Sequence, residues 1–518
     1  MIETGVHSSA KKFPTWGYAA VLIALCFVSR LPQLLSPKLF LDGDECVMGL
    51  MAKHALEGRG IPMFLWGASY GFSLIETSAG ALGILIFGFG AASLKIGILA
   101  VWSLGALFSF EALSSLLGNR RAFLATSLLI FAPAWAVMSM KALGGYATAF
   151  ALTSIVIYLA VRLRDKPGKA VWILIGGLTA LVYYAERLWL PGLLPVVLYV
   201  LIKRRRLADW AGWMVGGTAV GLLLELIQRG MYAVVRLPPV ARSFGFANLV
   251  NLVLAVPSRI YANLTGSYFL TSNIEPGLVT KVAAVLWGVS ISAGILFQVY
   301  RLAKRRSHPW SNVFFLSTVL SAGLALLPAY EFGPRYVLPL IGFAVLWLGT
   351  TAADWGDRGG RLRAAHVFLL AGFIGLGAFS IAEFRNFTFT GRFSNFGMTE
   401  ANRMNTLVTY LKSHEIRSTF SMHPLLQWQV VFYSREGILS RWEIDKDRYP
   451  EYSLAVDRVL REGGKTALVG YVPQEDLVRS LVSDPKTVVR VADEYFVYIG
   501  PDEKLLRRLK FEFKEAGD

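Results

Sequence analysis

Charged residues are scarce in this 518-residue chain, because Asp, Glu, Lys and Arg together make up only 17% of it. Hydrophobic residues make up 54%, and the mean hydropathy is +0.49. A water-soluble core cannot bury this much apolar surface, whereas helices that face lipid require it. The composition therefore excludes an ordinary soluble protein and predicts a polytopic α-helical membrane protein.

Cysteine and histidine are also rare. The chain has two cysteines, Cys26 in the first apolar run and Cys46 in an acidic stretch, which makes a disulfide framework improbable. The six histidines are scattered, without the spacing of metal ligands. We assign no metal ligand and no certain cofactor. Binding of a divalent cation such as Mg²⁺ or Mn²⁺ stays open, and carboxylates would be its ligands.

A cleavage site is missing after the first apolar run. Lys11 and Lys12 precede the run GYAAVLIALCFVSRLPQLL, but no small-residue site for signal peptidase follows it. We therefore expect a retained signal anchor whose N-terminus lies in the cytoplasm.

The net charge of +17 does not indicate a nucleic-acid partner. Most Lys and Arg of the apolar part form short clusters between hydrophobic runs, as topology-setting charges do. Hydropathy predicts eleven spans: 17–36, 95–118, 122–139, 146–163, 171–186, 188–203, 210–228, 279–300, 311–330, 336–353 and 366–384.

A further apolar run at 71–90 is long enough to cross but contains Glu76 and five glycines. If it does not cross, 17 basic residues gather in the cytoplasmic loops, whereas a crossing would move them all to the outer face. The positive-inside bias favours the first arrangement. We therefore expect 71–90 to be re-entrant or to lie on the surface, within a structured extracytoplasmic loop over 37–93.

The chain changes character near residue 400. Short apolar strands at 419–422, 467–472 and 487–500 alternate with candidate amphipathic helices at 453–461 and 474–482. This pattern predicts a small soluble α/β domain at 391–518, after a membrane module at 1–390. The topology puts this accessory domain on the outer side, with the loop 37–93.

The stretch LFLDGDECVMGLMAKH at 39–54 places Asp42, Asp44 and Glu45 just after the first predicted span. Capping of a helix that begins near Asp44 would explain acids there, since helix N-termini favour anions. The alternative is a general base at the membrane surface, within reach of a lipid-linked substrate.

With these residues the chain resembles the GT-C class of lipid-dependent glycosyltransferases, and within it the bacterial branch of the protein mannosyltransferase family (glycosyltransferase family 39 and relatives). The shared features are the pair Asp44 and Glu45, the segment GIPMFLWGASYGFSLIE with Tyr70 and Glu76, the turn KALGGY at 141–146 and the late turn RYVLP at 335–339. The resemblance covers most of residues 15–355. Within this region we expect Glu76 to bind substrate.

The resemblance implies transfer of a sugar from a polyprenyl-phosphate carrier to a hydroxyl of a glycan, lipid or protein, with inversion, in the bacterial inner membrane. It gives Asp44 the role of base and Glu45 that of a supporting acid. Asp42 has no firm counterpart, and we leave it as a ligand of the acceptor or of a cation. Such a donor carries its own phosphate leaving group, so the enzyme needs a base on one side and cations on the other.

The candidates for the cationic side are Lys141, Arg187 and Arg335, each at the outer end of a span. Snorkelling at the interface is the alternative explanation for them. For Arg335 we favour phosphate binding, because the preceding Gly-Pro fixes the turn and a guanidinium suits a phosphate. Stacking on sugar or lipid, or a place in the interfacial aromatic belt, would explain three tyrosines: Tyr70, Tyr146 and Tyr336.

Two departures limit what the resemblance implies. The inserted repeat domain of eukaryotic protein mannosyltransferases is absent, and so is the Trp-Trp-Asp signature of oligosaccharyltransferases. Transfer of whole oligosaccharides to asparagine is therefore disfavoured. The main rival is a transporter or flippase for lipid-linked sugars, although the chain has no evident internal repeat. A scaffold that displays the C-terminal domain is a third option, and it leaves the acidic loop unexplained.

Overall fold

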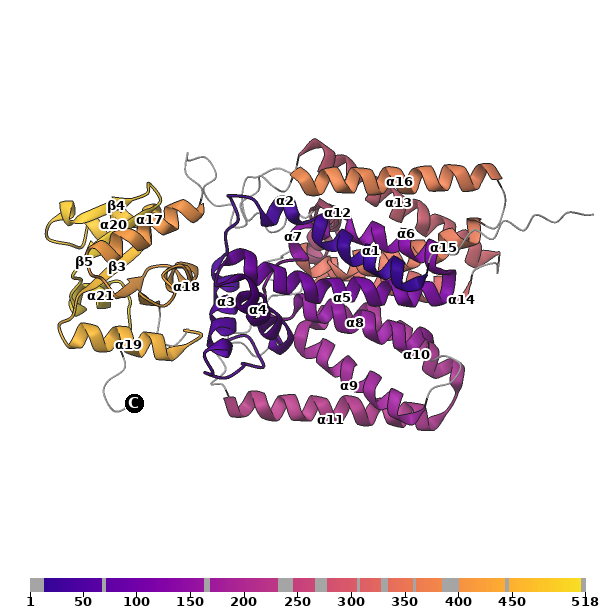
Figure 1. Ribbon diagram of the computed structural model, residues 1–518, viewed down its shortest axis with the longest axis horizontal. Helices are drawn as coiled ribbons and strands as arrows, with labels where there is room; N and C mark the ends of the chain where they lie inside the picture. Colours follow the sequence, from indigo (N-terminus) through magenta and orange to yellow (C-terminus); the bar gives the residue numbers. More distant parts are fainter. Residues whose placement is uncertain are drawn as a thin grey trace, which may run out of the picture.

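A helical bundle and a separate C-terminal α/β domain make up the protein, with the first loop between them (Figure 1). The computed structural model describes residues 14–67, 71–162, 168–231, 246–265, 277–304, 308–327, 334–356, 360–383, 400–442 and 447–513. Lys11 and Lys12 lie outside these ranges, and so does Tyr70.

Each of the eleven predicted spans coincides with a helix. They are α1 (Thr15–Val28), α5 (Ala91–Leu117), α6 (Asn119–Ile130), α8 (Tyr146–Arg162), α9 (Lys169–Glu186), α10 (Leu190–Arg204), α11 (Leu207–Met231), α13 (Leu278–Ala303), α14 (Pro309–Gly323), α15 (Pro339–Gly356) and α16 (Gly360–Glu383). Among the described residues, six helical segments are long and apolar enough to span a membrane. Eleven crossings remain a prediction.

The predicted span 122–139 is interrupted. Helix α6 ends at Ile130, and the chain restarts as the short helix α7 (Ala134–Met138) after Pro133. Proline cannot donate the backbone hydrogen bond that a continuous helix needs, and the residue before it avoids the helical conformation. The break places the turn at 139–145 beside the first loop.

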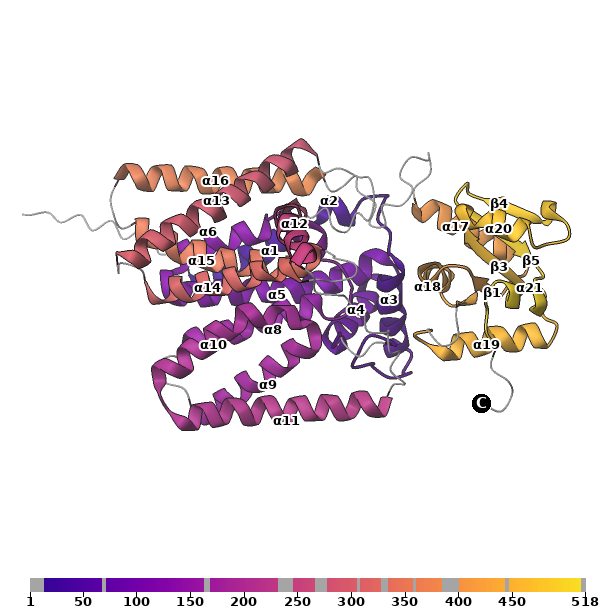
Figure 2. The same ribbon diagram turned by 180° about the vertical axis from the view of Figure 1, so that it is seen from behind.

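The first loop is helical and lies between the bundle and the C-terminal domain (Figure 2). After the short α2 (Leu31–Leu34) it contains α3 (Gly43–Leu56) and α4 (Leu74–Phe87). With 14 residues, α4 is about 21 Å long, which is short of the roughly 30 Å hydrocarbon core. It turns back at Gly88 into α5, and Gly83 and Gly97 let the two backbones touch. Helix α1 has the same length, so the length of α4 does not decide the matter, and a non-crossing 71–90 stays a prediction.

The predicted long loop at 229–278 contains a further helix, α12 (Phe246–Thr265), which sequence reasoning missed. Pro257 lies inside this helix. Three 3₁₀ turns lie at helix ends. Turn η1 (Arg187–Trp189) follows α9, η3 (Leu324–Leu326) follows α14, and η4 (Pro334–Val337) precedes α15.

The C-terminal domain is a five-stranded sheet between two layers of helices. Its strands are β1 (Ser418–Ser421), β2 (Leu439–Arg441), β3 (Thr466–Tyr471), β4 (Val488–Val491) and β5 (Tyr495–Ile499), in the order β2-β1-β3-β5-β4. Strands β2, β1 and β3 are parallel, while β5 is antiparallel to both β3 and β4. The predicted strand 487–500 is thus a hairpin, which turns at Ala492 and Asp493 with positive φ.

Side chains alternate between the two faces of this sheet. Ala467 and Val469 of β3 pack under α17 (Glu400–Ser413) and α18 (Pro424–Tyr433), and Leu468 packs on the other face. That face is covered by α19 (Pro450–Arg461), α20 (Glu475–Arg479) and α21 (Glu503–Arg508). The 3₁₀ turns η7 (Val472–Gln474) and η8 (Pro485–Thr487) lie in the connections.

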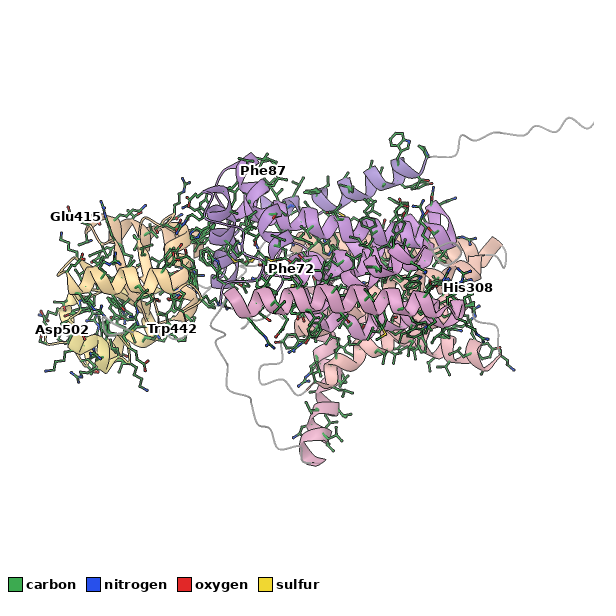
Figure 3. The ribbon with its side chains drawn as sticks, turned by 90° about the horizontal axis from the view of Figure 1, so that it is seen from below. Phe72, Phe87, His308, Glu415, Trp442 and Asp502 are labelled. Carbon is green, nitrogen blue, oxygen red and sulfur yellow. The ribbon has the colours of Figure 1, made fainter. Side chains whose placement is uncertain are left out.

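The basic connections and the acidic loop lie at opposite ends of the bundle. His308, which precedes α14 in one of the predicted cytoplasmic loops, lies far from Glu415 and Asp502 of the C-terminal domain (Figure 3). Phe87, at the end of α4, lies beside that domain. Which of the two ends faces the cytoplasm stays a prediction from the positive-inside bias.

Candidate functional site

Helix α3 begins at the acidic motif. Asp42 is its N-cap: the Asp42 Oδ1 accepts a hydrogen bond from the Glu45 backbone N–H at 2.9 Å, and the Glu45 carboxylate accepts from the Asp42 N–H at 3.4 Å. This reciprocal pair is a capping box, which fixes the first turn. The capping explanation therefore holds for Asp42 and Glu45.

Below this first turn lies a buried cluster of charges, which we call the ion cluster: Asp42, Glu45, Lys95 and Lys141. Lys95 Nζ lies 2.5 Å from Glu45 Oε1, and Lys141 Nζ lies 3.1 Å from Glu45 Oε2. Lys141 also pairs with Asp42. Two carboxylates thus face two ammonium groups, which is what burial of charge requires.

The ion cluster changes how its members are interpreted. Both oxygens of Glu45 are occupied by the two lysines, and the Ala142 N–H donates to Oε1 at 3.3 Å. Burial alone would raise the pKa of the Asp42 carboxyl, but the adjacent Lys141 ammonium holds that pKa below its usual range. Lys141 was predicted to face a phosphate, and here it pairs with acids of α3.

Lys95 was missed as a site residue. It lies in the first turns of α5, fully buried, at the start of a predicted span. A charged lysine in a membrane span is energetically unfavourable unless it is paired. Its position in an apolar run was therefore the sequence signal that could have marked Lys95 as a site residue. Its partner Glu45 is distant in the sequence, so the pairing itself was not readable.

Asp44 has different surroundings from its two neighbours. It points to the C-terminal domain, where its Oδ1 lies 2.8 Å from Arg448 Nη2, and the two side chains are 35% and 30% exposed. No other ion pair or hydrogen bond of the Asp44 side chain occurs within the described ranges. Of the three acids, Asp44 is the one outside the ion cluster and partly open to solvent.

The loop that bears Arg448 is held from both sides. On the domain side, the buried Asp447 accepts hydrogen bonds from Gln427 Nε2 at 3.0 Å, from the Tyr449 N–H at 3.2 Å and from the Ser453 hydroxyl. Burial raises the pKa of the Asp447 carboxyl. This network fixes the backbone on either side of Arg448.

On the other side, the first loop packs directly against this segment. The Tyr449 ring stacks on Trp66, with centroids 4.3 Å apart and planes inclined by 23°. Gly67 has a φ of +65°, and a Cβ there would lie 2.7 Å from the Arg448 Cα. Glycine is thus required both by its conformation and by the close approach of the two backbones.

A second contact joins α3 to the C-terminal domain. His54 Nε2 lies 2.9 Å from Glu436 Oε1 and 3.1 Å from the Tyr452 hydroxyl, while Lys53 and Arg59 also pair with Glu436. Burial opposes ionisation of Glu436, yet hydrogen bonds from His54, Lys53 and Tyr452 hold its pKa well below the usual range. Together with Glu57, which pairs with Lys53 and Arg59, we call this group the interface cluster.

The interface cluster contains the one grouping of possible metal ligands that the described residues offer. Ligand atoms of His54, Glu57 and Glu436 lie within 4.8 Å of one another. However, Lys53 contacts both carboxylates, and Arg59 lies 3.1 Å from Glu436. Two cations already neutralise the two acids, so the donor set does not fit a divalent ion well.

The remaining predicted site residues lie around the turn at 139–145. Glu76, fully buried in α4, accepts from the Thr148 N–H at 3.0 Å and so binds the N-terminus of α8. Tyr146 begins α8 and is half-buried. Arg187 is exposed in η1, and no ion pair links it to the acids of α3 in the structure as described.

Arg335 and Tyr336 both lie in η4, just before α15. Tyr336 is half-buried, and the Arg335 side chain lies outside the described part of the chain. The structure therefore joins Asp42, Glu45 and Lys141 in the ion cluster and pairs Asp44 with Arg448, whereas a contact between these groups and Arg335 stays a prediction.

The chain is similar in fold to solved membrane proteins. It matches ArnT from Cupriavidus metallidurans in the apo state with a TM-score of 0.55 and 13% identity, over 94% of this chain and 99% of that one. It also matches the Archaeoglobus fulgidus oligosaccharyltransferase tethered with an acceptor peptide, with a TM-score of 0.50 and 11% identity, over 90% and 70% of the two chains. No protein-family model and no curated protein matches the chain.

Both solved structures have the GT-C fold. The predicted fold class is therefore confirmed: the chain is a multi-pass helical membrane protein of GT-C architecture with a small C-terminal α/β domain. The narrower likeness to the protein mannosyltransferase branch stays a prediction.

Proposed function

We propose that the protein is an integral-membrane glycosyltransferase, which transfers a sugar from a polyprenyl-phosphate carrier to a hydroxyl-bearing acceptor. Support for this class comes from the GT-C fold that the chain shares with ArnT and with an oligosaccharyltransferase. The order of motifs along the chain, from the acids of α3 to the late turn at 335–339, supports it independently.

Asp44 is the base in this proposal, and one observation carries the assignment. Asp42 and Glu45 are engaged in the capping box and the ion cluster, whereas Asp44 is partly exposed at the junction of the bundle and the C-terminal domain. A base must reach the proton that it accepts, so the exposed acid is the suitable one. Glu45, in contrast, supports the first turn of α3.

The reaction is a single displacement with inversion. The acceptor hydroxyl gives its proton to the Asp44 carboxylate while its oxygen attacks the anomeric carbon from the side opposite the phosphate. The bond from that carbon to the phosphate oxygen breaks, and the electron pair leaves with the polyprenyl phosphate. No nucleotide takes part, and cationic side chains near the leaving phosphate would stabilise its charge.

We place the protein in the inner membrane of a bacterium, with the N-terminus in the cytoplasm and the site and C-terminal domain on the outer side. The opposite locations of the basic connections and the acidic loop support this orientation. A label introduced at Glu415 and tested for access from outside the cell checks it.

Substitution of Asp44 by Asn in the purified protein tests the proposal. With carriers that bear labelled sugars, we expect transfer to fall by about 10²–10⁴-fold, the usual contribution of a general base. Glu57→Gln, a change to an exposed acid on the same helix, is the matched control and should transfer normally. Transfer at the wild-type rate by the Asp44→Asn protein would remove the base assignment. Passage of the carrier across vesicles without any transfer would favour a flippase.

A further inference from the structure

The C-terminal domain contributes a guanidinium directly to the proposed site. Arg448 and Asp44 come from segments about 400 residues apart, yet Nη2 and Oδ1 lie 2.8 Å apart. The backbone around Arg448 is fixed by the hydrogen bonds of Asp447 and by the stack of Tyr449 on Trp66. The packing of the C-terminal domain against the first loop therefore positions this ion pair.

One nitrogen of this guanidinium is unused. Arg448 Nη1 is buried and has no hydrogen-bond partner among the described residues. Buried donors in folded proteins are nearly always paired, so an unpaired one beside a proposed catalytic acid points to a ligand atom that completes it. The partner must be an acceptor, and a guanidinium prefers the oxygens of a carboxylate or a phosphate.

The neighbouring charges favour a phosphate oxygen. Within the ion cluster, Lys95 and Lys141 are already matched by Asp42 and Glu45. In the interface cluster, Lys53 and Arg59 are matched by Glu57 and Glu436. Among the described residues, Arg448 pairs with Asp44 alone and keeps a buried donor without a partner.

We propose that Arg448 binds the phosphate of the lipid-linked donor and, by moving to it, releases Asp44 to act as the base. In the unliganded protein the guanidinium covers Oδ1 of the Asp44 carboxylate, which leaves Oδ2 as the oxygen that can accept a proton from a hydroxyl. A phosphate offers more negative charge and several oxygens, so it competes for the guanidinium through Nη1. Base and donor site are thereby coupled, because departure of the guanidinium to the donor phosphate frees both oxygens of the Asp44 carboxylate for the acceptor.

This inference rests on the proposed function, because it takes Asp44 as the base. Its binding half can be tested without any transfer. The probe is undecaprenyl phosphate, titrated into the purified full-length protein in lipid nanodiscs, with intrinsic tryptophan fluorescence as the signal. Substitution Arg448→Gln should weaken binding by about tenfold or more, the loss of one charge-assisted contact. Arg448→Lys should restore part of the lost affinity, since lysine keeps the positive charge but lacks the planar guanidinium that binds a phosphate with two nitrogens.

A variant of the same interface separates phosphate binding from simple docking. Glu436→Gln weakens the interface cluster but removes no phosphate ligand. It should lower the melting temperature and leave the affinity for undecaprenyl phosphate unchanged. Equal losses of affinity in the Arg448→Gln and Glu436→Gln proteins would assign Arg448 a structural role only and overturn the proposal. Unchanged affinity in the Arg448→Gln protein would also overturn it.

The Asp44→Asn protein distinguishes the two proposals. Because this change frees the guanidinium, it should bind undecaprenyl phosphate at least as tightly as the wild type while losing transfer. If it transferred normally, the base assignment would fail, although the binding result for Arg448 would still stand. If it bound the probe more weakly, the competition between Asp44 and phosphate for Arg448 would be refuted.

Discussion

Three acids within four residues of α3 have three different surroundings. Asp42 caps the helix, Glu45 is enclosed by two lysines, and Asp44 meets an arginine of the other domain. The sequence indicated that the group was unusual and named Asp44 as the base. It could not show which acid is buried and which is exposed, because Lys95, Lys141 and Arg448 come from elsewhere in the chain.

The predictability of individual site residues follows the same rule. Asp42, Glu45 and Lys141 were selected from the sequence, and the structure joins them in the ion cluster. Asp44 was also selected, and it pairs with Arg448 instead. Arg448 was not selected, since it lies in a domain interpreted as accessory and has no motif around it. Glu76 was selected as a substrate ligand, whereas its observed contact is with the backbone of α8.

At the residue scale, the ion cluster predicts a large cost for removing one member. Substitution Lys95→Met should destabilise the protein by about 3–5 kcal/mol, because it leaves the Glu45 charge buried with one partner fewer. Unfolding in a denaturing detergent, followed by circular dichroism, measures this loss. Lys169→Met, at an exposed lysine, should have little effect.

The double variant Glu45→Met with Lys95→Met should recover much of that stability, because Lys141 then pairs with Asp42 alone and no charge is left unmatched. If the double variant still transfers sugar, Glu45 contributes to activity by stabilising the first turn of α3 and not by contacting the substrate. A double variant no more stable than Lys95→Met would contradict the charge-balance account.

At the scale of elements, hydropathy predicted the helices well and their interruptions poorly. All eleven predicted spans contain helix, because long apolar runs in lipid have few alternatives to it. The break after Ile130 and the helix α12 were missed. Pro133 precedes α7 at the break in one predicted span, and Pro257 lies inside α12. Hydropathy alone does not register either effect.

The close packing of α4 on α5 gives an element-scale prediction. A Cβ at Gly97 would lie 2.2 Å from the Ala79 carbonyl oxygen, so Gly97→Ala should force the two helices apart and cost about 1–3 kcal/mol. The melting temperature in detergent measures the effect. Gly221→Ala, where nothing lies within 4 Å, is the matched control and should be neutral or slightly stabilising. Equal melting temperatures for the two variants would refute the packing argument.

At the scale of the whole molecule, the interface cluster should make docking of the C-terminal domain sensitive to acid. The folded pKa of Glu436 lies below its ordinary value of 4.5, so its contribution to stability is complete above that pH and declines as the pH falls further. We therefore expect this contribution to be constant between pH 7 and pH 5. Melting temperatures across this range and down to pH 3 check the expectation.

Glu436→Gln should be less stable than the wild type at pH 7 and should lose this part of the acid sensitivity, whereas Glu415→Gln, at an exposed acid, should follow the wild type. An acid profile of Glu436→Gln that is parallel to that of the wild type would assign the sensitivity to other groups.

The contact between Asp44 and Arg448 has a consequence for biosynthesis. A polypeptide emerges from the ribosome with its amino end first, so α3 reaches its final compartment long before residue 448 has been made. A truncated or unfinished chain would present the acids with neither the arginine that covers them nor the domain that encloses them. Such a chain would lack the donor contact proposed here, so premature sugar transfer by nascent protein would be disfavoured by the order of synthesis itself.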